Sequence, residues 1–531
     1  VLRRLIDHHD MLRMVVLPTG EQVVLASVPP FSITAYDLRE ASAEAVESHL
    51  ESIRAELSHQ VLPAERFPLF EVRASQVPGD RVHLHISLDL LVADAFSVQL
   101  LIEQCAELYQ NEQAPIAPLK HTFREYFLAA AQRRDPNTTA FQRSMEYWRE
   151  RLETLPGPPE LPLAADADVK GKRHFSRRKG GLDQATWRAF RQNASAAGVT
   201  ASMALATAYG EVLRAHGRGN RLTLNLTLFN RLPILEDVER IIGDFTSGTL
   251  LEMDGSHPDT FAGRARRLQG QLFEDLEHSV VSSVQVLREA SRHGRLDTGI
   301  GMPYVFTSLL SETGRSLFIP DSVKIVDVVS QTPQVWLDHQ VFELNGELYY
   351  SWDSVDALFP KGLIASIFEA YNRLLHRLAH DAFAWELPAR QPLPPEQLAR
   401  RVAFNATERP VPTERMEALF LRQAALRPQA PAIITQHRVI TYGELERRSA
   451  RLAAWLIARG AEPERLVAVV AEKGPEQVIA ALAILRAGGA YLPLDPALPS
   501  ERLRDILHQA QASFALTQSH LEGSLHWPED L

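Results

Sequence analysis

The pattern of apolar and polar positions changes its period between Val82 and Leu101. Apolar and polar residues alternate from Val82 to Leu88, which predicts a β-strand. From Ala95 onward the apolar residues recur at helical spacing, so a helix is expected there. The short segment between these two elements carries two carboxylates, Asp89 and Asp94. This loop is therefore the first candidate for a functional site.

Further helices and strands are predicted on both sides of this stretch. Residues 1–16 have the pattern of a helix end that runs into a strand, and a helix is expected between Asp37 and His59. Phe67–Ser75 is predicted as a strand that is entered through Pro68. Two amphipathic helices then lead to the proline-rich run Leu155–Leu163, which we interpret as the crossover between two lobes.

The alternation of strands and helices continues from His174 to about His380, which predicts a mixed α/β fold built from two lobes. We place the first lobe at residues 1–165 and the second at residues 166–386. Residues 387–412 are rich in proline and charge and read as a linker with a short helix at Pro395–Arg401. A further unit, residues 413–531, follows.

Composition excludes several classes of protein. The 531 residues carry a formal net charge of -10, which argues against a nucleic-acid-binding protein. The single cysteine, Cys105, lies in an apolar helical pattern, so an intramolecular disulfide is impossible and a reducing cytoplasm is the natural location. No apolar run of membrane-spanning length occurs, and the first residues lack the layout of a signal peptide.

Six motifs occur in the order found in heterocyclization domains of nonribosomal peptide synthetases. Asp89-x4-Asp94-x2-Ser97 resembles one signature of these domains, and the helix that ends in LPGPPELPL resembles another. Four more matches are NLTLFNR (225–231), IGDFTSG (242–248), PYVFTSL (303–309) and SQTPQVWLDHQ (330–340). The resemblance implies two chloramphenicol-acetyltransferase-like lobes that form a V, with the site between them. It also implies that the first lobe is truncated at its front.

Two stretches of the last unit resemble the first core motifs of adenylation domains of the same synthetases. They are ITYGEL (440–445) and LRAGGAYLPLDPALPSER (485–502), in which Gly488 and Gly489 let a helix end and the backbone turn. No glycine-rich phosphate loop follows before residue 531. We therefore expect the beginning of an adenylation domain, which would use ATP and Mg²⁺ only together with its remainder.

The implied reaction joins a carrier-bound acyl thioester to carrier-bound Cys, Ser or Thr and then expels water to close a thiazoline or oxazoline ring. This step needs a proton donor and a base. The catalytic pair of the family maps onto Thr307 and Asp338. Without the resemblance, Asp338 would read as a strand-end aspartate and Thr307 as an ordinary β-branched strand residue. Substrate-positioning candidates are Asn225, Gln331, Thr332 and Ser308, although Asn225 could equally satisfy a strand edge.

We assign a structural role to Asp89, Asp94, Ser97 and Arg231, and no metal is predicted. Asp94 is expected to cap the helix that begins at Ala95. The planar guanidinium of Arg231 suits a bidentate partner, so we expect it to pair with Asp94 or Asp89 across the lobe interface.

The implied partners are upstream and downstream carrier domains, which bear 4'-phosphopantetheine arms, and the rest of the adenylation domain. Arg177, Arg178 and Lys179 are candidates to meet an acidic carrier protein, but a solvated strand edge explains such a short charge run as well. No nucleic acid or membrane is expected as a partner. Siderophore synthetases of the pyochelin or yersiniabactin type are the setting by analogy.

Two other functions remain open. A plain condensation domain would carry HHxxxDG, and its second His would fall at Leu90. The pair His8-His9 lacks the required spacing and reads as a solvated helix end. A catalytically silent docking scaffold is the second of them, because a fold survives the loss of one motif.

Overall fold

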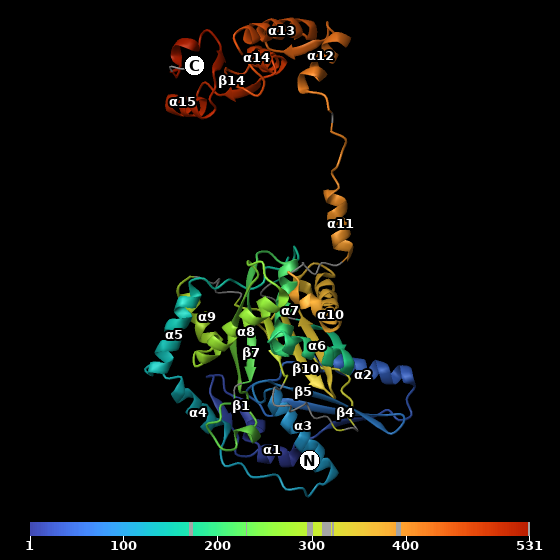
Figure 1. The fold of residues 1–531 in the computed structure, drawn as a ribbon. Coiled ribbons are helices and arrows are strands. Elements are labelled where there is room, and N and C mark those ends of the chain that lie inside the picture. Colours follow the sequence, from blue (N-terminus) through green and yellow to red (C-terminus); the bar gives the residue numbers. More distant parts are fainter. Residues whose placement is uncertain are drawn as a thin grey trace. The chain divides into compact units, whose positions relative to one another are not determined.

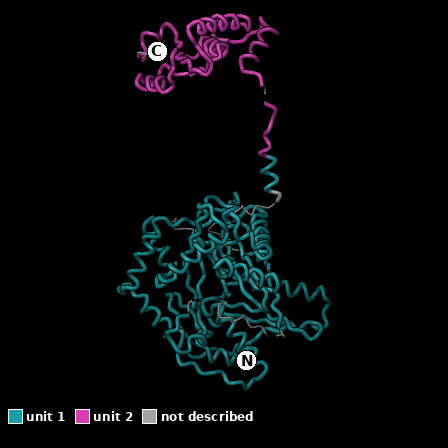
Figure 2. Tube along the Cα trace, viewed as in Figure 1, with its two compact units in different colours: residues 1–403 teal, residues 404–531 magenta. Residues whose placement is uncertain are grey.

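The computed structural model describes residues 1–168, 174–229, 231–294, 301–310, 320, 323–388, 395–411, 413–528 and 531. The chain divides into two compact units, residues 1–403 and residues 404–531 (Figure 2). The helix α11 (Pro395–Asn405) lies at the division and is longer than the predicted Pro395–Arg401. Each unit is described by itself.

The first part of unit 1 is built around a three-stranded sheet in the order β3-β4-β5 (Figure 1). Strands β3 and β4 are parallel, and β4 and β5 are antiparallel. The predicted strand and helix of the central stretch are confirmed as β5 and α3. The elements of this part are α1 (Leu2–His8), η1 (Asp10–Arg13), β1 (Met14–Val16), β2 (Gln22–Val24), β3 (Thr34–Asp37), α2 (Ala43–Leu57), β4 (Phe70–Val77), β5 (Arg81–Leu88), α3 (Ala95–Gln110), α4 (Phe123–Arg133) and α5 (Thr139–Leu152).

The alternation of apolar and polar residues in β5 did not show which of its two faces is buried. Its apolar residues are on the outside, with Leu84 60% and Ile86 63% exposed. Helix α2 covers the opposite, more polar face, where the His49 Nε2 atom lies 3.3 Å from the Ser75 hydroxyl of β4. An alternating pattern thus predicts the strand, but the packing of α2 decides which face is covered.

The prediction that His9 belongs to a solvated helix end is wrong. Its side chain is buried, and its Nε2 atom lies 2.7 Å from Gln104 Oε1 of α3. Burial is the main cause that lowers the pKa of His9 to about 4, so the ring is neutral. His9 therefore joins α1 to α3 and is not a surface residue.

The second part of unit 1 contains a six-stranded sheet in the order β6-β11-β10-β9-β7-β8 within the described part of the chain (Figure 1). Strand β9 is parallel to β7 and β10, whereas the other pairs are antiparallel. The elements are β6 (Ser176–Leu182), α6 (Gln184–Ala196), α7 (Ala201–His216), β7 (Arg221–Phe229), η2 (Val238–Arg240), β8 (Thr246–Asp254), α8 (Phe261–Glu277), α9 (Ser283–Arg292), β9 (Tyr304–Ser308), β10 (Leu337–Leu344), β11 (Glu347–Ser354), η3 (Asp356–Leu358), α10 (Leu363–His380) and η4 (Ala382–Glu386).

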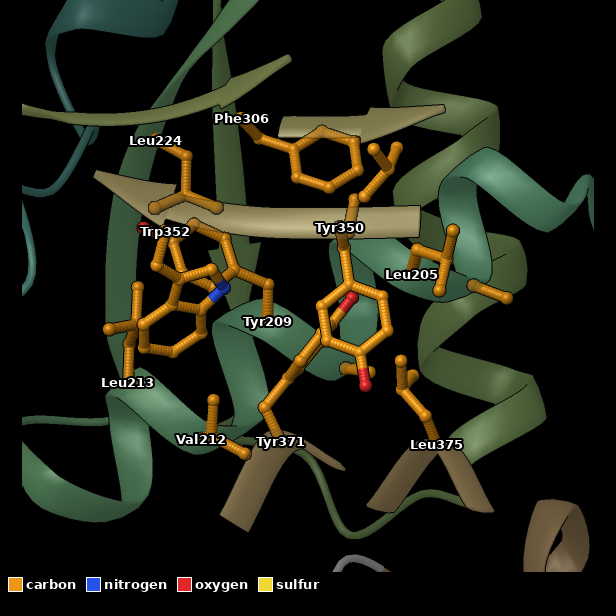
Figure 3. Close-up of a cluster of buried hydrophobic side chains, with 14 of the residues drawn as sticks. Leu205, Tyr209, Val212, Leu213, Leu224, Phe306, Tyr350, Trp352, Tyr371 and Leu375 are labelled. Carbon is orange, nitrogen blue, oxygen red and sulfur yellow. The ribbon is translucent and has the colours of Figure 1, made fainter. Parts of the chain in front are cut away.

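One face of this sheet forms the main core with helices α7 and α10 (Figure 3). Figure 3 shows Phe306, Tyr350 and Trp352 of the strands packed towards Tyr209 of α7 and Tyr371 of α10. Helix α7 is buried along most of its length, as expected for a helix that is apolar all round. Since side chains alternate along a strand, the residues between these core positions lie on the other face of the sheet.

Unit 2 is an α/β fragment with a parallel three-stranded sheet in the order β15-β14-β16 among the described residues. The predicted helix end is confirmed: α14 stops before Gly488, whose φ is 85°, and the Gly489 N–H donates to Ile484 O at 3.0 Å. The elements are α12 (Met416–Leu426), β12 (Pro431–Ile434), β13 (Val439–Thr441), α13 (Tyr442–Ala458), β14 (Leu466–Val470), α14 (Pro475–Arg486), β15 (Ala490–Leu494), α15 (Ser500–Gln509), β16 (Phe514–Thr517) and η5 (Glu522–Ser524).

Candidate active site

The register of the six-stranded sheet brings the two predicted catalytic residues to one face. Asp338 of β10 stands opposite Val305 of β9, and Gln340 stands opposite Thr307. Thr307 therefore sits diagonally across from Asp338, two residues further along, where side chains of neighbouring strands meet. Strand β7 continues these rows, because Asn225 is opposite Val305 and Thr227 is opposite Thr307.

Asp338 and Thr307 form a hydrogen-bonded pair. The Thr307 hydroxyl donates to Asp338 Oδ1 over 3.3 Å, and each residue is 9% exposed. Burial is the main cause that raises the pKa of Asp338 to about 6, and the hydrogen bond from Gln340 is the largest opposing effect. A carboxyl group with such a pKa both accepts and gives up a proton near neutral pH, which suits a general acid/base.

A buried ion pair lies beside Asp338. The Gln340 Nε2 atom donates to Asp338 Oδ2 at 2.6 Å, and the Gln340 Oε1 atom accepts from Arg177 Nη2 at 3.3 Å. Arg177 also binds both carboxylate oxygens of Asp353, with an Nε to Oδ1 distance of 2.6 Å. The side chain of Arg177 is 8% exposed and that of Asp353 is fully buried. Four strands, β6, β11, β10 and β9, thus hold one connected polar network.

Sequence reasoning missed Thr227 and Gln340. The Thr227 and Thr307 hydroxyl oxygens lie 2.9 Å apart, so Thr227 extends the pair by a second alcohol. Both missed residues stand two positions after a predicted one, Thr227 after Asn225 and Gln340 after Asp338. The i, i+2 spacing within a strand was the signal that could have found them.

The positioning candidate Asn225 shares this face of the sheet, further towards β8. A Cβ atom on Gly248 would lie 3.0 Å from Asn225 Oδ1 and 2.6 Å from Ser283 Oγ. The Oδ1 atom is buried and has no hydrogen-bond partner among the described residues. A buried amide oxygen without a partner is rare in proteins, and it leaves an acceptor on the face of Asp338.

Three other positioning candidates are not part of the cluster. Ser308 follows Thr307 and so points to the opposite face, where its hydroxyl accepts from the Leu310 N–H over 3.4 Å. Gln331 precedes β10 and donates to Ser58 O at the end of α2. Thr332 lies in the same segment, and its carbonyl accepts from the Val335 N–H at 3.0 Å. The structure brings none of the three into contact with Asp338 through a described hydrogen bond.

The predicted ion pair between Arg231 and Asp94 is present. Arg231 Nη2 donates to Asp94 Oδ1 at 3.0 Å and to Ser97 Oγ at 2.8 Å. Arg231 Nη1 donates to two main-chain carbonyls, Val238 O and Ile241 O, at 2.9 and 2.8 Å. The guanidinium carbon also lies 4.0 Å from the centre of the Phe245 ring. The side chains of Arg231 and Asp94 are 7% and 0% exposed, so this is a buried pair.

The motif around Asp94 is a structural junction. Asp94 caps α3 as predicted, because its Oδ1 accepts from the Ser97 N–H at 2.7 Å. Ser97 Oγ and the Asp94 N–H both donate to Gly243 O, at 2.9 and 3.0 Å, which ties the central loop to the segment before β8. Asp89, the other predicted partner of Arg231, has a different contact: the Asp89 Oδ1 atom accepts from the Leu91 N–H at 3.0 Å.

The interpretation of residues 177–179 as a solvated strand edge is wrong for Arg177, while contact of this run with a carrier protein stays a prediction. Arg177 is buried in the network above. Arg178 pairs with Asp356 at 2.6 Å, and Lys179 pairs with Asp327 at 2.5 Å. Strand β6 is an edge strand, but all three cations already have acidic partners.

Within the described residues, no group of three or more His, Cys, Asp or Glu side chains is arranged to hold a metal ion. In the same part of the chain, no helix is both long and apolar enough to cross a membrane.

The fold and the motifs define a condensation-type domain, and the chain belongs to the condensation domain family of nonribosomal peptide synthetases. The Condensation domain model matches residues 1–384, and the model described as AMP-binding enzyme matches residues 420–529. The predicted family and mixed α/β fold are thereby confirmed, and the AMP-binding region is only partial.

Phenyloxazoline synthase MbtB of Mycobacterium tuberculosis is 36% identical over 519 residues, which are 97% of this chain and 36% of that protein. Pyochelin synthetase PchF of Pseudomonas aeruginosa is 34% identical over 513 residues, which are 96% of this chain and 27% of that protein. The chain thus spans about a third or less of these curated relatives.

Two solved structures are similar in fold and sequence. The nonribosomal peptide synthetase FmoA3 covers the whole chain with a TM-score of 0.83 and 34% identity, and the match takes up 55% of that chain. The EpoB cyclization-docking bidomain from Sorangium cellulosum has a TM-score of 0.65 and 33% identity. That match covers 72% of this chain and 77% of the bidomain.

Proposed function

We propose that unit 1 is a heterocyclization domain, which forms a peptide bond and then closes a thiazoline or oxazoline ring. The observation that carries the proposal is the buried Thr307–Asp338 pair, in which burial raises the pKa of the carboxyl group to about 6. The names of the relatives, a phenyloxazoline synthase and a cyclization bidomain, support the same reaction class.

In the proposed reaction, the amine of carrier-bound Cys, Ser or Thr attacks an upstream acyl thioester and forms an amide. The thiol or hydroxyl then adds to the amide carbonyl carbon, which gives a cyclic hemiaminal. Asp338 in its acid form supplies a proton to the departing oxygen, and its carboxylate form takes the proton from the ring nitrogen. Thr307 orients the carboxyl group and the leaving hydroxyl. Asn225 offers the substrate an acceptor that has no partner among the described residues.

The substrates enter as thioesters on the 4'-phosphopantetheine arms of upstream and downstream carrier domains, which we propose as partners. Residues 413–531 form the beginning of an adenylation domain, to which ATP and Mg²⁺ belong only with its remainder. We also propose residue 165 as the boundary between the lobes and residues 387–412 as the linker. A cytoplasmic location goes with this function and with the single cysteine, Cys105.

The test is mass spectrometry of the product formed when the chain is mixed with an acylated upstream carrier and a downstream carrier loaded with Cys, Ser or Thr. Loss of one water from the dipeptide indicates cyclization, an unshifted dipeptide indicates a plain condensation domain, and no dipeptide indicates a scaffold. We expect the cyclised product from the wild type. Thr307→Val and Asp338→Asn should lower the yield of cyclised product at least about tenfold.

A matched control is Thr249→Val in strand β8 of the same sheet, which β7 separates from β9. Thr249 is 2% exposed, and its hydroxyl has no partner among the described residues, so the same substitution removes no described hydrogen bond. Equal losses of cyclised product in Thr249→Val and Thr307→Val would contradict a specific role for Thr307.

A further inference from the structure

The orientation of the Gln340 amide is fixed by its neighbours. An arginine side chain has only donors, so the group that faces Arg177 must be the Gln340 oxygen. The Gln340 NH2 group then faces Asp338 Oδ2, at 2.6 Å. Arg177 is itself held by both oxygens of Asp353, and Asp353 Oδ2 also accepts from the Ser330 N–H at 3.2 Å. The amide therefore has one orientation that satisfies every contact.

This orientation distinguishes the two oxygens of Asp338. Oδ2 must accept the hydrogen bond from Gln340, so a proton on Oδ2 would clash with an N–H hydrogen. Oδ1 faces the Thr307 hydroxyl at 3.3 Å, and a hydroxyl is able both to donate and to accept. When Asp338 is protonated, the proton therefore belongs on Oδ1.

We propose that Arg177, acting through Gln340, is a positioning residue that confines the transferable proton of Asp338 to the oxygen that faces Thr307. This inference rests on the proposed cyclodehydration and adds the residues that direct its proton. Neither Arg177 nor Gln340 touches a reacting atom in the proposal.

The proton path balances. Asp338 Oδ1–H donates to Thr307 Oγ1, and Thr307 passes its own hydrogen to the hydroxyl of the hemiaminal. The carbon–oxygen bond breaks and water leaves, while the electron pair of the ring nitrogen forms the C=N bond. The proton of that nitrogen returns to the Asp338 carboxylate, so the acid is regenerated. Thr227, whose hydroxyl oxygen is 2.9 Å from that of Thr307, keeps a partner for the relay in both states.

The charged and titratable groups around Asp338 come from three other elements. Asp353 of β11 raises the pKa of Asp338, and Arg177 of β6 lowers it. Tyr209 of α7 lies on the core side, and its own pKa is raised by burial and by the charge of Asp338. Burial is still the largest cause of the raised Asp338 pKa, and Gln340 is the strongest opposing hydrogen bond. Removing the Gln340 amide should therefore raise the pKa of Asp338 further.

The first test is the pair Gln340→Met and Gln340→Glu in the carrier-loaded cyclization assay, followed against pH. Gln340→Met removes the hydrogen bond that lowers the pKa, so the pH limb of cyclization that reports on Asp338 should move upward. In Gln340→Glu, a carboxyl oxygen faces Asp338 Oδ2 and the two must share a proton, which draws it away from Thr307. Both variants should raise the ratio of linear to cyclised dipeptide by roughly tenfold.

The second test compares adjacent arginines of β6. Arg177→Met should shift the product ratio and the pH limb as Gln340→Met does, and Arg177→Lys should restore part of the wild-type ratio. Arg178→Met is the matched control: it also breaks an ion pair, with Asp356, but Arg178 has no described contact to Gln340. If Arg177→Met fails to fold, the double variant Arg177→Met/Asp353→Asn is used in its place, because it removes both charges of the buried pair.

The positioning role is overturned if folded Gln340→Met and Arg177 variants keep the wild-type pH limb and product ratio. Cyclization by the wild type would still stand in that case. A wild type that makes only linear dipeptide would overturn the proposed function instead. In that case the pH dependence of urea unfolding decides the inference, because Gln340→Met should shift it near neutral pH, where Asp338 titrates. Arg178→Met should change it only in acid, because the bond from Arg178 helps to hold the pKa of Asp356 below its usual value. An unshifted curve would then refute the role of Gln340.

Discussion

Replacement of Asp338 by Asn should stabilise the protein above pH 6 and have no such effect below pH 4. The Asn side chain keeps the local hydrogen bonds, because its oxygen can accept from Gln340 and its NH2 group can donate to Thr307. It therefore resembles the acid form of Asp338 with the proton on Oδ1. The variant removes the charge and leaves the packing in place.

The magnitude follows from the pKa of the carboxyl group. In the folded chain the pKa of Asp338 is raised, chiefly by burial, from 3.8 to about 6. A difference of about 2 between the folded and unfolded pKa values corresponds to about 3 kcal/mol. Between the two pKa values the folded state holds a proton that the unfolded state has released. The unfolding free energy of the wild type thus falls as the pH rises from about 4 to about 6, and this loss is absent in Asp338→Asn.

The assay is urea unfolding of both proteins from pH 4 to pH 8, followed by tryptophan fluorescence. Five of the seven tryptophans lie in unit 1, and Trp336 and Trp352 are buried beside β10, so the signal reports chiefly on the unit that carries the site. We expect the difference in unfolding free energy, variant minus wild type, to increase by about 3 kcal/mol across this range. A difference that stays constant with pH would refute the raised pKa of Asp338. It would also remove the physical basis of its role as an acid near neutral pH.

Three further predictions concern stability. Asp94→Ala should lower the unfolding free energy by roughly 3–5 kcal/mol, because it leaves the buried Arg231 unpaired and uncaps α3. Asp94→Asn should cost clearly less. Equal urea midpoints for Asp94→Ala and the wild type would contradict the structural role of this junction. Gly180→Ala should cost about 1–3 kcal/mol, because a Cβ atom there would lie 2.6 Å from Tyr350 Cζ, and Gly157→Ala, with open space around it, is the calorimetric control. Tyr209→Phe should be neutral or stabilising by about 1 kcal/mol in thermal unfolding, since the buried Tyr209 hydroxyl has no partner among the described residues. A large loss of stability would show that this hydroxyl does have a hydrogen-bond partner.

The alternation of apolar and polar residues along the chain predicted the strands well, but it did not predict which face of a strand other elements cover. It predicted β5 and the helix α3 that follows, and the Asp94 cap was predicted from residue type alone. It could not show that Leu84 and Ile86 lie on the outside, because that depends on the placement of α2. His9 was misjudged for the same reason: its burial comes from Gln104 of α3, about a hundred positions away in sequence.

The candidate site illustrates the limit more sharply. Thr307 and Asp338 were chosen by their resemblance to a family motif, since an isolated strand-end aspartate is more often structural. Their proximity follows from the parallel register of β9 and β10, which no local pattern specifies. Once that register is known, alternation is sufficient to add Thr227 and Gln340, because each lies two residues from a predicted position.

The buried Arg177 shows why a charge run is ambiguous in a sequence. Three consecutive cations on an edge strand alternate between two faces, so a single explanation for all three is wrong on geometry alone. Antiparallel pairing with β11 places Asp353 directly opposite Arg177, and this cross-strand pair costs less to bury than either charge alone. Its charge is neutralised there, and the guanidinium still has a donor for Gln340. Gln340 in turn donates to Asp338, whose pKa burial raises to about 6.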